Sequence, residues 1–227
     1  MNITESNFNL VDFRIGEYPL LNINHLLYIN YVEDIRSASI RMEVQITDSQ
    51  TGLVSSLQGM EPVFIGWEDH KGNAIANYMV IYDIQDRVTK GGSSKATLLL
   101  CTPDMINNAA TKLSKRFGKG GGDKISKIVA EDLLGKQLNT VYDIEGSIEE
   151  TVNKISFISP FWAPFTIIKW LCSKAISAKS AGGKNASAGY CFFQNNSGYN
   201  FKSYDSFTRE EPVRKIVVGH KAEEMEE

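Results

Sequence analysis

The stretch Ser39-Ile-Arg-Met-Glu-Val-Gln-Ile-Thr-Asp48 alternates apolar and polar side chains without interruption. A period of two residues is typical of a β-strand with one buried and one solvated face. The stretch therefore predicts a β-strand with one face in the core and the other face in solvent. The expected buried face consists of Ile40, Met42, Val44 and Ile46. The expected solvated face consists of Arg41, Glu43, Gln45 and Thr47.

Further strands are expected on both sides of this one, separated by turn signals at 48–52, 68–73 and 90–94. Several short strands between such turns predict an antiparallel barrel or sandwich. In the run 78–84, period-two alternation places Tyr78, Val80, Tyr82 and Ile84 on one side. The expected strands are 62–67, 78–84 and 96–101, with a strand pair or one long bent strand over 20–31.

Beyond Thr102 the apolar period changes from two residues to that of a helix. Thr102 is a good N-cap and Pro103 suits the first helical position. Glycines 118–122 interrupt the first helix, and Gly135 is the expected end of the second. A short strand is expected near 138–144, a loop over 177–189, and a hairpin of 190–194 with 199–204 about the turn 195–198. Helices are thus expected near 103–117, 123–134 and 164–177.

The chain is therefore expected to have an α+β fold, with β-strands first. We expect a β domain over 1–102, an α+β lobe over 103–215 and an acidic tail over 216–227. In the lobe, the aromatic residues Trp162, Phe165, Trp170 and Phe193 are assigned to the core, because aromatic side chains contribute much of the area buried in a core.

Composition excludes several classes of protein. The chain has 227 residues, 42% of them apolar, and a net charge of −3, so whole-molecule attraction to DNA or an anionic membrane is not expected. No apolar run reaches the roughly 18 residues of a spanning helix, and no signal peptide is evident, so we expect a soluble protein made in the cytoplasm. Its three cysteines are expected to be buried free thiols.

A search for catalytic chemistry yields no assignment. The run 118–126 is rich in glycine and lysine but lacks the spacing of a phosphate-binding loop, so we interpret it as a flexible linker between helices. The histidines show no metal-ligand spacing, and no serine-nucleophile motif is present. Carboxylate pairs such as Asp83/Asp86 and Glu149/Glu150 are common on any protein surface. We therefore assign no catalytic, cofactor-binding or metal-binding residues and expect no enzymatic activity.

Two alternatives remain open at this point. One is a peptidoglycan hydrolase, which would need an acid–base pair of carboxylates in a cleft. The other is a nucleic-acid-binding module that uses the basic segment 112–127, which holds six Lys/Arg and one Asp.

The C-terminal third carries a resemblance to a known family. The ordered series Ser159-Pro-Phe-Trp-Ala-Pro-Phe165, Ile168-Lys-Trp-Leu171 and Cys191-Phe-Phe-Gln-Asn-Asn-Ser-Gly-Tyr-Asn-Phe201 is similar to the baseplate central hub proteins of contractile-tailed bacteriophages of the T-even kind and their marine relatives. The N-terminal half agrees more loosely, in the order of the strand 40–46, the turn 48–52 and the segment 57–65. The resemblance covers about residues 15–211.

The resemblance implies a structural role in the virion. Hub proteins of this kind are trimers on the tail axis, built on tube-like β-barrels, so residues 1–102 would form such a barrel. They join the central spike to the tail tube, adapt three-fold to six-fold symmetry and leave a channel for DNA. After the position of Tyr204 the family continues into a second barrel, whereas only 209–227 remain here. For contact between subunits we name the polar residues Arg41, Glu43, Gln45, Glu68 and Asp69.

Overall fold

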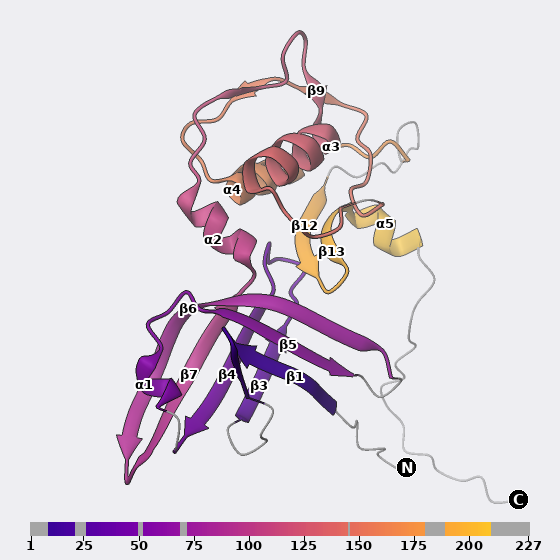
Figure 1. Cartoon of the computed structure of the whole chain (residues 1–227). Coiled ribbons are helices and arrows are strands. Elements are labelled where there is room, and N and C mark those ends of the chain that lie inside the picture. The colour runs from indigo at the N-terminus through magenta and orange to yellow at the C-terminus, as the bar shows by residue number, and fades with distance from the viewer. Residues whose placement is uncertain are drawn as a thin grey trace, which may run out of the picture.

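The protein has two parts, a curled antiparallel sheet and a lobe of helices and short strands stacked on one end of it (Figure 1). The hairpin of β12 and β13 lies where the two parts meet. The computed structural model describes residues 9–20, 26–49, 52–68, 72–144, 146–179 and 189–209.

Seven antiparallel strands form the sheet, and the predicted strand over 39–48 lies within it as β4. Met42, Val44 and Ile46 are buried while Arg41 is exposed, so the predicted alternation is confirmed. The strand order across the sheet is β2 (Tyr18–Pro19), β1 (Asn9–Ile15), β5 (Pro62–Glu68), β6 (Ala74–Lys90), β7 (Ser93–Cys101), β4 (Arg41–Asp48) and β3 (Leu26–Val32).

One face of the sheet curls around a hydrophobic core. The short helix α1 (Leu53–Ser56), which the sequence did not predict, inserts Leu53 and Val54 into this core. Among the described strands, the edge strands β2 and β3 are not hydrogen-bonded to each other, so these strands form an open, curled sheet. Core side chains from the strands include Phe13, Ile15, Ile40, Val63, Ile65, Met79, Ile81, Leu98 and Leu100.

Strand β6 corrects one prediction about side-chain orientation. Tyr78 is 68% exposed and faces away from the core, whereas Ile84 packs against the core, so the two do not share a side. A β-bulge between Ile81 and Asp83 causes the difference, since one extra residue reverses the alternation beyond it.

The first helix of the lobe is shorter than predicted. Helix α2 (Pro103–Ala110) begins after Thr102 as expected but ends seven residues before 117. The chain becomes extended at Thr111, and the backbone N–H of Leu113 donates to the carbonyl of Trp162. Strand pairing with a distant segment has therefore overridden the helical spacing of 103–117.

The second helix is longer than predicted. The helical turn α3 (Ile125–Lys127) continues into a π-helix, η2 (Ile128–Leu138), which passes through Gly135. It ends at Asn139, whose left-handed backbone (φ 49°) is one that asparagine tolerates. No strand forms over the described residues of 138–144, so that prediction is wrong.

The rest of the lobe combines one further helix with short strand pairs. Helix α4 (Pro164–Cys172) begins where predicted and ends before 177, and the predicted hairpin about the turn 195–198 is confirmed. The predicted loop over 177–189 lies largely outside the described residues. The remaining elements are β8 (Arg116–Phe117), β9 (Asp123–Lys124), β10 (Lys154–Ile155), β11 (Phe157–Ile158), β12 (Tyr190–Asn195), β13 (Gly198–Ser203) and α5 (Tyr204–Arg209).

The four aromatic residues assigned to the core differ in burial. Phe165 is buried in the core of the lobe. Trp162 and Trp170 are half-buried and pack against that core. Phe193 is half-buried and lies beside Phe207 of α5, with ring centroids 6.2 Å apart. The core assignment therefore holds fully for Phe165 only, because the other three rings lie at the border of the core.

Buried polar contacts join the sheet to the lobe. The Gln194 side-chain oxygen accepts hydrogen bonds from the Thr102 hydroxyl at 2.9 Å and from the backbone N–H of Ile40 at 3.3 Å. The Ser39 hydroxyl lies 2.9 Å from that of Thr102. Two separate hydrophobic clusters lie on either side of these contacts. The division into domains at residue 102 stays a prediction.

Candidate subunit interface

Three of the five residues named for subunit contact lie together on β4. Arg41, Glu43 and Gln45 project from the face of the sheet opposite the core, here called the outer face. The Gln45 amide donates to the Thr97 hydroxyl at 3.3 Å across the β4–β7 pair. The strand register thus aligns the three side chains in one row, as the alternation predicted.

The other two residues do not join this row. Glu68 ends β5, three strands away from β4, and accepts a hydrogen bond from the Asn9 side chain at 3.2 Å. Asp69 lies outside the described residues.

The outer face also holds an aromatic cluster that was not singled out from the sequence. The rings of Phe64 and Tyr78 lie 4.9 Å apart across the β5–β6 pair, and the Arg14 guanidinium lies 5.2 Å from the Phe64 ring. Alternation along β5 and β6 indicates which side chains of each strand share a face. The sequence does not show that these two strands pair or in what register, so the contact between Phe64 and Tyr78 could not be predicted.

The edge strand β3 is apolar, and much of it is exposed. Its sequence, Leu-Leu-Tyr-Ile-Asn-Tyr-Val, holds no charged residue, and among the described strands it pairs with β4 alone. Leu27, Tyr28 and Val32 are 53%, 46% and 41% exposed. An exposed apolar edge is a ready template for pairing with another chain.

A surface groove of about 430 Å³ lies beside this edge. The Tyr31 and Trp67 rings meet edge to face in it, with centroids 5.1 Å apart. The groove is therefore apolar, with room for side chains of a partner strand. Its lining residues are Leu26, Leu27, Tyr28, Ile29, Tyr31 and Trp67.

Of the two carboxylate pairs considered for catalysis, Glu149/Glu150 has structural partners. Glu149 accepts hydrogen bonds from the backbone and hydroxyl of Ser203 and from the Ser177 hydroxyl, while Glu150 pairs with Lys124. Burial acts to raise the pKa of Glu149, but its hydrogen bonds outweigh burial and lower it. A lowered pKa suits an anchoring carboxylate rather than a general acid.

The glycine-rich run 118–126 is not the flexible linker between helices that the sequence suggested. Its residues 118–122 join the short strands β8 and β9, and Gly118 and Gly122 pack on the backbone of Ile155. A Cβ at Gly118 would lie 2.0 Å from the Ile155 carbonyl oxygen. Glycine is therefore required at this position by close packing and by its positive φ of 71°.

The cysteines are free and buried, as predicted. Burial raises the pKa of Cys101 to about 11 and that of Cys172 to about 12, although Arg41 opposes the change at Cys101. Both thiols are therefore protonated at neutral pH and poor nucleophiles.

Two further searches concern the described part of the chain only. No group of His, Cys, Asp or Glu there is arranged to hold a metal ion. No helix there is long and apolar enough to cross a membrane.

Comparison with known proteins finds similarity at the level of structure. The sequence matches no model of a protein family, and no curated protein matches it. Among solved structures, the chain is similar to the 43 kDa tail protein of prophage MuSo2 from Shewanella oneidensis, with a TM-score of 0.52 and 11% identity over 85% of this chain and 53% of the other. It is similar to a tail protein from Neisseria meningitidis MC58, with a TM-score of 0.54 and 9% identity over 86% of this chain and 51% of the other.

A third similar structure is the half-lidded PdpA–VgrG complex of Francisella, with a TM-score of 0.52 and 11% identity over 92% of this chain and 34% of the other. The chain thus spans about half the length of the two tail proteins. At these identities the likeness establishes a shared fold.

Proposed function

We propose that this chain is a structural protein of a bacteriophage contractile tail that assembles through the edges of its seven-stranded sheet. The fold shared with two tail proteins supports a tail role. The uncharged edge β3 is the observation that carries the assembly step, since an isolated subunit would leave it exposed.

The two edges of the sheet suit head-to-tail pairing. Strand β1 pairs with β2 only at Arg14 and Ile15. Among the described strands, most of this edge of β1 and the free edge of β3 therefore have no strand partner. Pairing β3 of one subunit with β1 of the next joins two different surfaces, and such contacts generate rings when the rotation closes. The row Arg41, Glu43 and Gln45 lies on β4, the strand next to the edge strand β3, and would therefore lie close to the joint.

In its fuller form the proposal places a trimer at the tail axis, as the baseplate hub between the central spike and the tail tube. There the ring adapts three-fold to six-fold symmetry and leaves a channel through which DNA passes without specific binding. The chain would act in the virion by its shape and would catalyse no reaction.

Light scattering on the purified chain at micromolar concentration tests the assembly step. We expect a closed oligomer whose interfaces each bury more than the roughly 800 Å² of most crystal contacts. Leu27→Lys with Val32→Lys should give monomers with an unchanged circular dichroism spectrum, because lysine blocks edge pairing.

The matched control places lysines at the exposed positions Val141 and Val152 of the lobe, 88% and 47% exposed, and should leave the oligomer intact. A wild-type chain that stays monomeric would contradict the proposal. So would an oligomer that the β3 variant leaves unchanged. Electron microscopy of an intact tail tests the position at the axis.

A further inference from the structure

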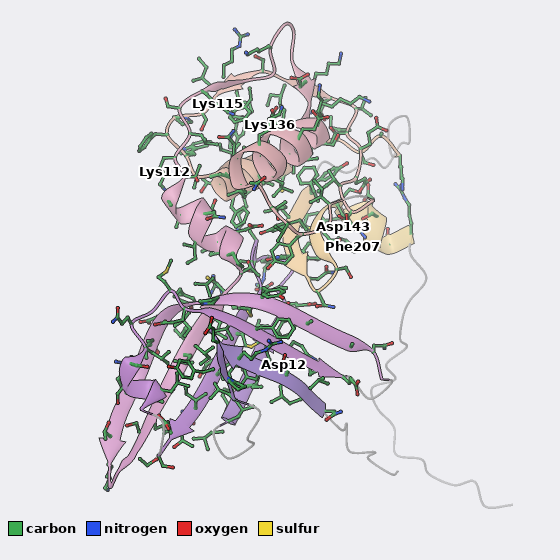
Figure 2. All side chains as sticks on the ribbon, viewed as in Figure 1. Asp12, Lys112, Lys115, Lys136, Asp143 and Phe207 are labelled. Atoms are coloured by element: carbon green, nitrogen blue, oxygen red, sulfur yellow. The ribbon has the colours of Figure 1, made fainter. Side chains whose placement is uncertain are left out.

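A basic groove lies in the lobe, away from the sheet. It is a hollow of about 490 Å³ between β8, the glycine turn after β8 and one side of η2. Figure 2 shows Lys115 and Lys136 in this upper part of the molecule, with Lys112 beside them. The residues that line the basic groove are Lys115, Arg116, Phe117, Gly118, Lys119, Asp123, Lys127, Glu131, Asp132 and Lys136.

The positive charge of the groove is only partly neutralised from within. Five basic and three acidic side chains line it, which leaves a net charge of +2. Lys127 pairs with Asp123 at 3.8 Å and Lys136 with Asp132 at 2.8 Å, and both pairs lie on the helical side.

On the β8 side of the groove, the positive charge of the basic side chains is not neutralised by acidic groups of the described residues. Within the part of the chain that the structure describes, no carboxylate forms an ion pair with Lys115, Arg116 or Lys119. Lys115 instead lies 4.8 Å from the Phe117 ring centroid, and Arg116 donates to the Ser156 hydroxyl at 3.2 Å. Arg116 and Lys119 are exposed.

Two exposed apolar side chains, Ile158 and Phe161, here called the apolar knob, lie on β11 and in the turn that follows it. Ile158 is 70% exposed and lies directly opposite Arg116 in the β8–β11 pair, so the two side chains share a face. Phe161 is 67% exposed and has a φ of 63°. A bulky residue in the left-handed region is strained, and burial of the ring does not compensate for that strain here.

Hydrogen bonds on both sides of Phe161 hold this conformation. The backbone N–H of Ser159 donates to the Lys115 carbonyl at 2.9 Å, and the Leu113 N–H donates to the Trp162 carbonyl at 2.9 Å. The turn that presents Phe161 is therefore tied to the segment 113–116, which carries two of the three unpaired cations, Lys115 and Arg116. Strain of this kind, imposed by the surrounding structure, is concentrated at functional sites.

We propose that the basic groove and the apolar knob together dock an acidic segment of a partner protein that carries an apolar side chain. Carboxylates of the segment would face Lys115, Arg116 and Lys119, and its apolar side chain would pack on Ile158 and Phe161. This surface is separate from the sheet edges, so the proposal stands independently of the ring assembly.

A polypeptide fits this surface better than a nucleic acid. The exposed Glu131 faces into the groove, and a polypeptide can place a neutral group opposite it. A nucleic-acid backbone carries a charge at every step, and single-strand sites typically stack bases on several aromatic rings. The knob offers one aromatic ring and one aliphatic side chain.

Fluorescence anisotropy with labelled peptides on the full chain tests the proposal. The probe is a peptide in which Glu alternates with Gly and Leu, and its matched partner has Gln in place of Glu. We expect the Glu peptide to bind at least about tenfold more tightly at low salt, with an affinity that falls as salt is added. Equal binding of the two peptides, or no binding of the Glu peptide, would overturn the proposal.

Two pairs of charge reversals locate the site. Arg116→Glu with Lys119→Glu should weaken binding of the Glu peptide by about tenfold or more. Lys90→Glu with Lys95→Glu makes the same change in net charge on the exposed surface of the sheet hairpin and should leave the affinity within about twofold. An equal loss in both variants would overturn the proposal, since it would indicate attraction to net charge alone.

Phe161→Gly separates binding from folding. Glycine adopts a positive φ readily, so the melting temperature should stay the same or rise, while affinity for the Glu peptide should fall by about fivefold. Unchanged affinity would overturn the role of the knob. Tighter binding of a single-stranded oligonucleotide than of the Glu peptide, lost in the Arg116 and Lys119 variant, would replace the proposal with a nucleic-acid site.

Discussion

At the scale of single residues, a few positions are decided by contacts with distant backbone. Gly118 and Gly198 both have positive φ, and a Cβ at either would lie within about 2 Å of a carbonyl oxygen, that of Ile155 or that of Asp143. Other glycines with positive φ, such as Gly120, face open space. These sites therefore differ in packing although their backbone conformations are alike.

Gly118→Ala should destabilise the protein by more than about 3 kcal/mol, because both the φ of 71° and the contact with Ile155 oppose a Cβ. Gly120→Ala should cost only about 1 kcal/mol, since its φ of 67° is unfavourable but nothing lies within 4 Å. Urea unfolding of both variants measures the difference. Equal losses would mean that Ile155 does not lie against Gly118.

Glu149 should make the free energy of unfolding depend on pH in the acidic range. Its pKa is lowered from the usual 4.5, so the charged form is favoured by folding. The stabilisation is then complete above about pH 4.5 and is lost as the pH falls through the lowered value. Glu149→Gln should cost about 1–2 kcal/mol at neutral pH, and its difference from wild type should shrink at about pH 3.

Urea titrations of wild type and Glu149→Gln, at neutral pH and at about pH 3, measure the difference in the free energy of unfolding at each pH. Glu17→Gln, at an exposed position between β1 and β2, is the control and should change stability by less than about 0.5 kcal/mol. A Glu149→Gln deficit that is the same at both pH values would contradict the assigned role of the carboxylate.

At the scale of elements, the sequence predicts where helices begin and where turns lie better than it predicts where helices end. Helices α2 and α4 both begin at a proline, as the sequence indicated, and the hairpin of β12 and β13 forms about the predicted turn. The end of α2 was missed because Leu113 pairs with Trp162, forty-nine positions away. Caps and turns depend on neighbours in sequence, whereas strand pairs depend on the fold.

Trp170 shows how element packing sets stability in the lobe. Its half-buried ring lies 4.9 Å from that of Phe157 on β11 and 6.0 Å from that of Trp162. Trp170→Ala should therefore cost about 2–3 kcal/mol, at the low end for removal of a large aromatic side chain. Val141→Ala, at a position 88% exposed, should change stability by less than about 0.5 kcal/mol. Thermal and urea unfolding test both values, and a Trp170→Ala effect as small as the control would place the ring outside the packed structure.

At the scale of the whole molecule, a buried polar contact joins the two parts. Gln194 on β12 reaches Thr102, at the end of the sheet, and Ile40, just before β4. The three residues are far apart in sequence, and each is buried. Breaking this contact leaves the buried Ile40 N–H without its acceptor, which costs more than the bond itself contributes, whereas the Thr102 hydroxyl keeps the Ser39 hydroxyl as a partner.

Gln194→Ala should lower the free energy of unfolding by about 2–3 kcal/mol, since it leaves the Thr102 hydroxyl and the Ile40 N–H without this acceptor. Gln58→Ala, at an exposed position, is the matched control and should have little effect. Urea unfolding followed by tryptophan fluorescence measures both. A Gln194→Ala variant as stable as the control would show that this contact does not hold the sheet and the lobe together.

Local sequence patterns were enough to predict the strand at 39–48 and its two faces, the order of strands before helices, the starts of α2 and α4, and the hairpin about the turn 195–198. Each of these follows from periodicity or from caps and turns, which act over a few neighbouring residues. The same patterns do not show that β3 is an edge, that a bulge turns Ile84 toward the core, or that Arg116 lies opposite Ile158; the three-dimensional fold sets these features. These depend on which strands pair and in what register, and that choice rests on burial of residues far apart in the chain.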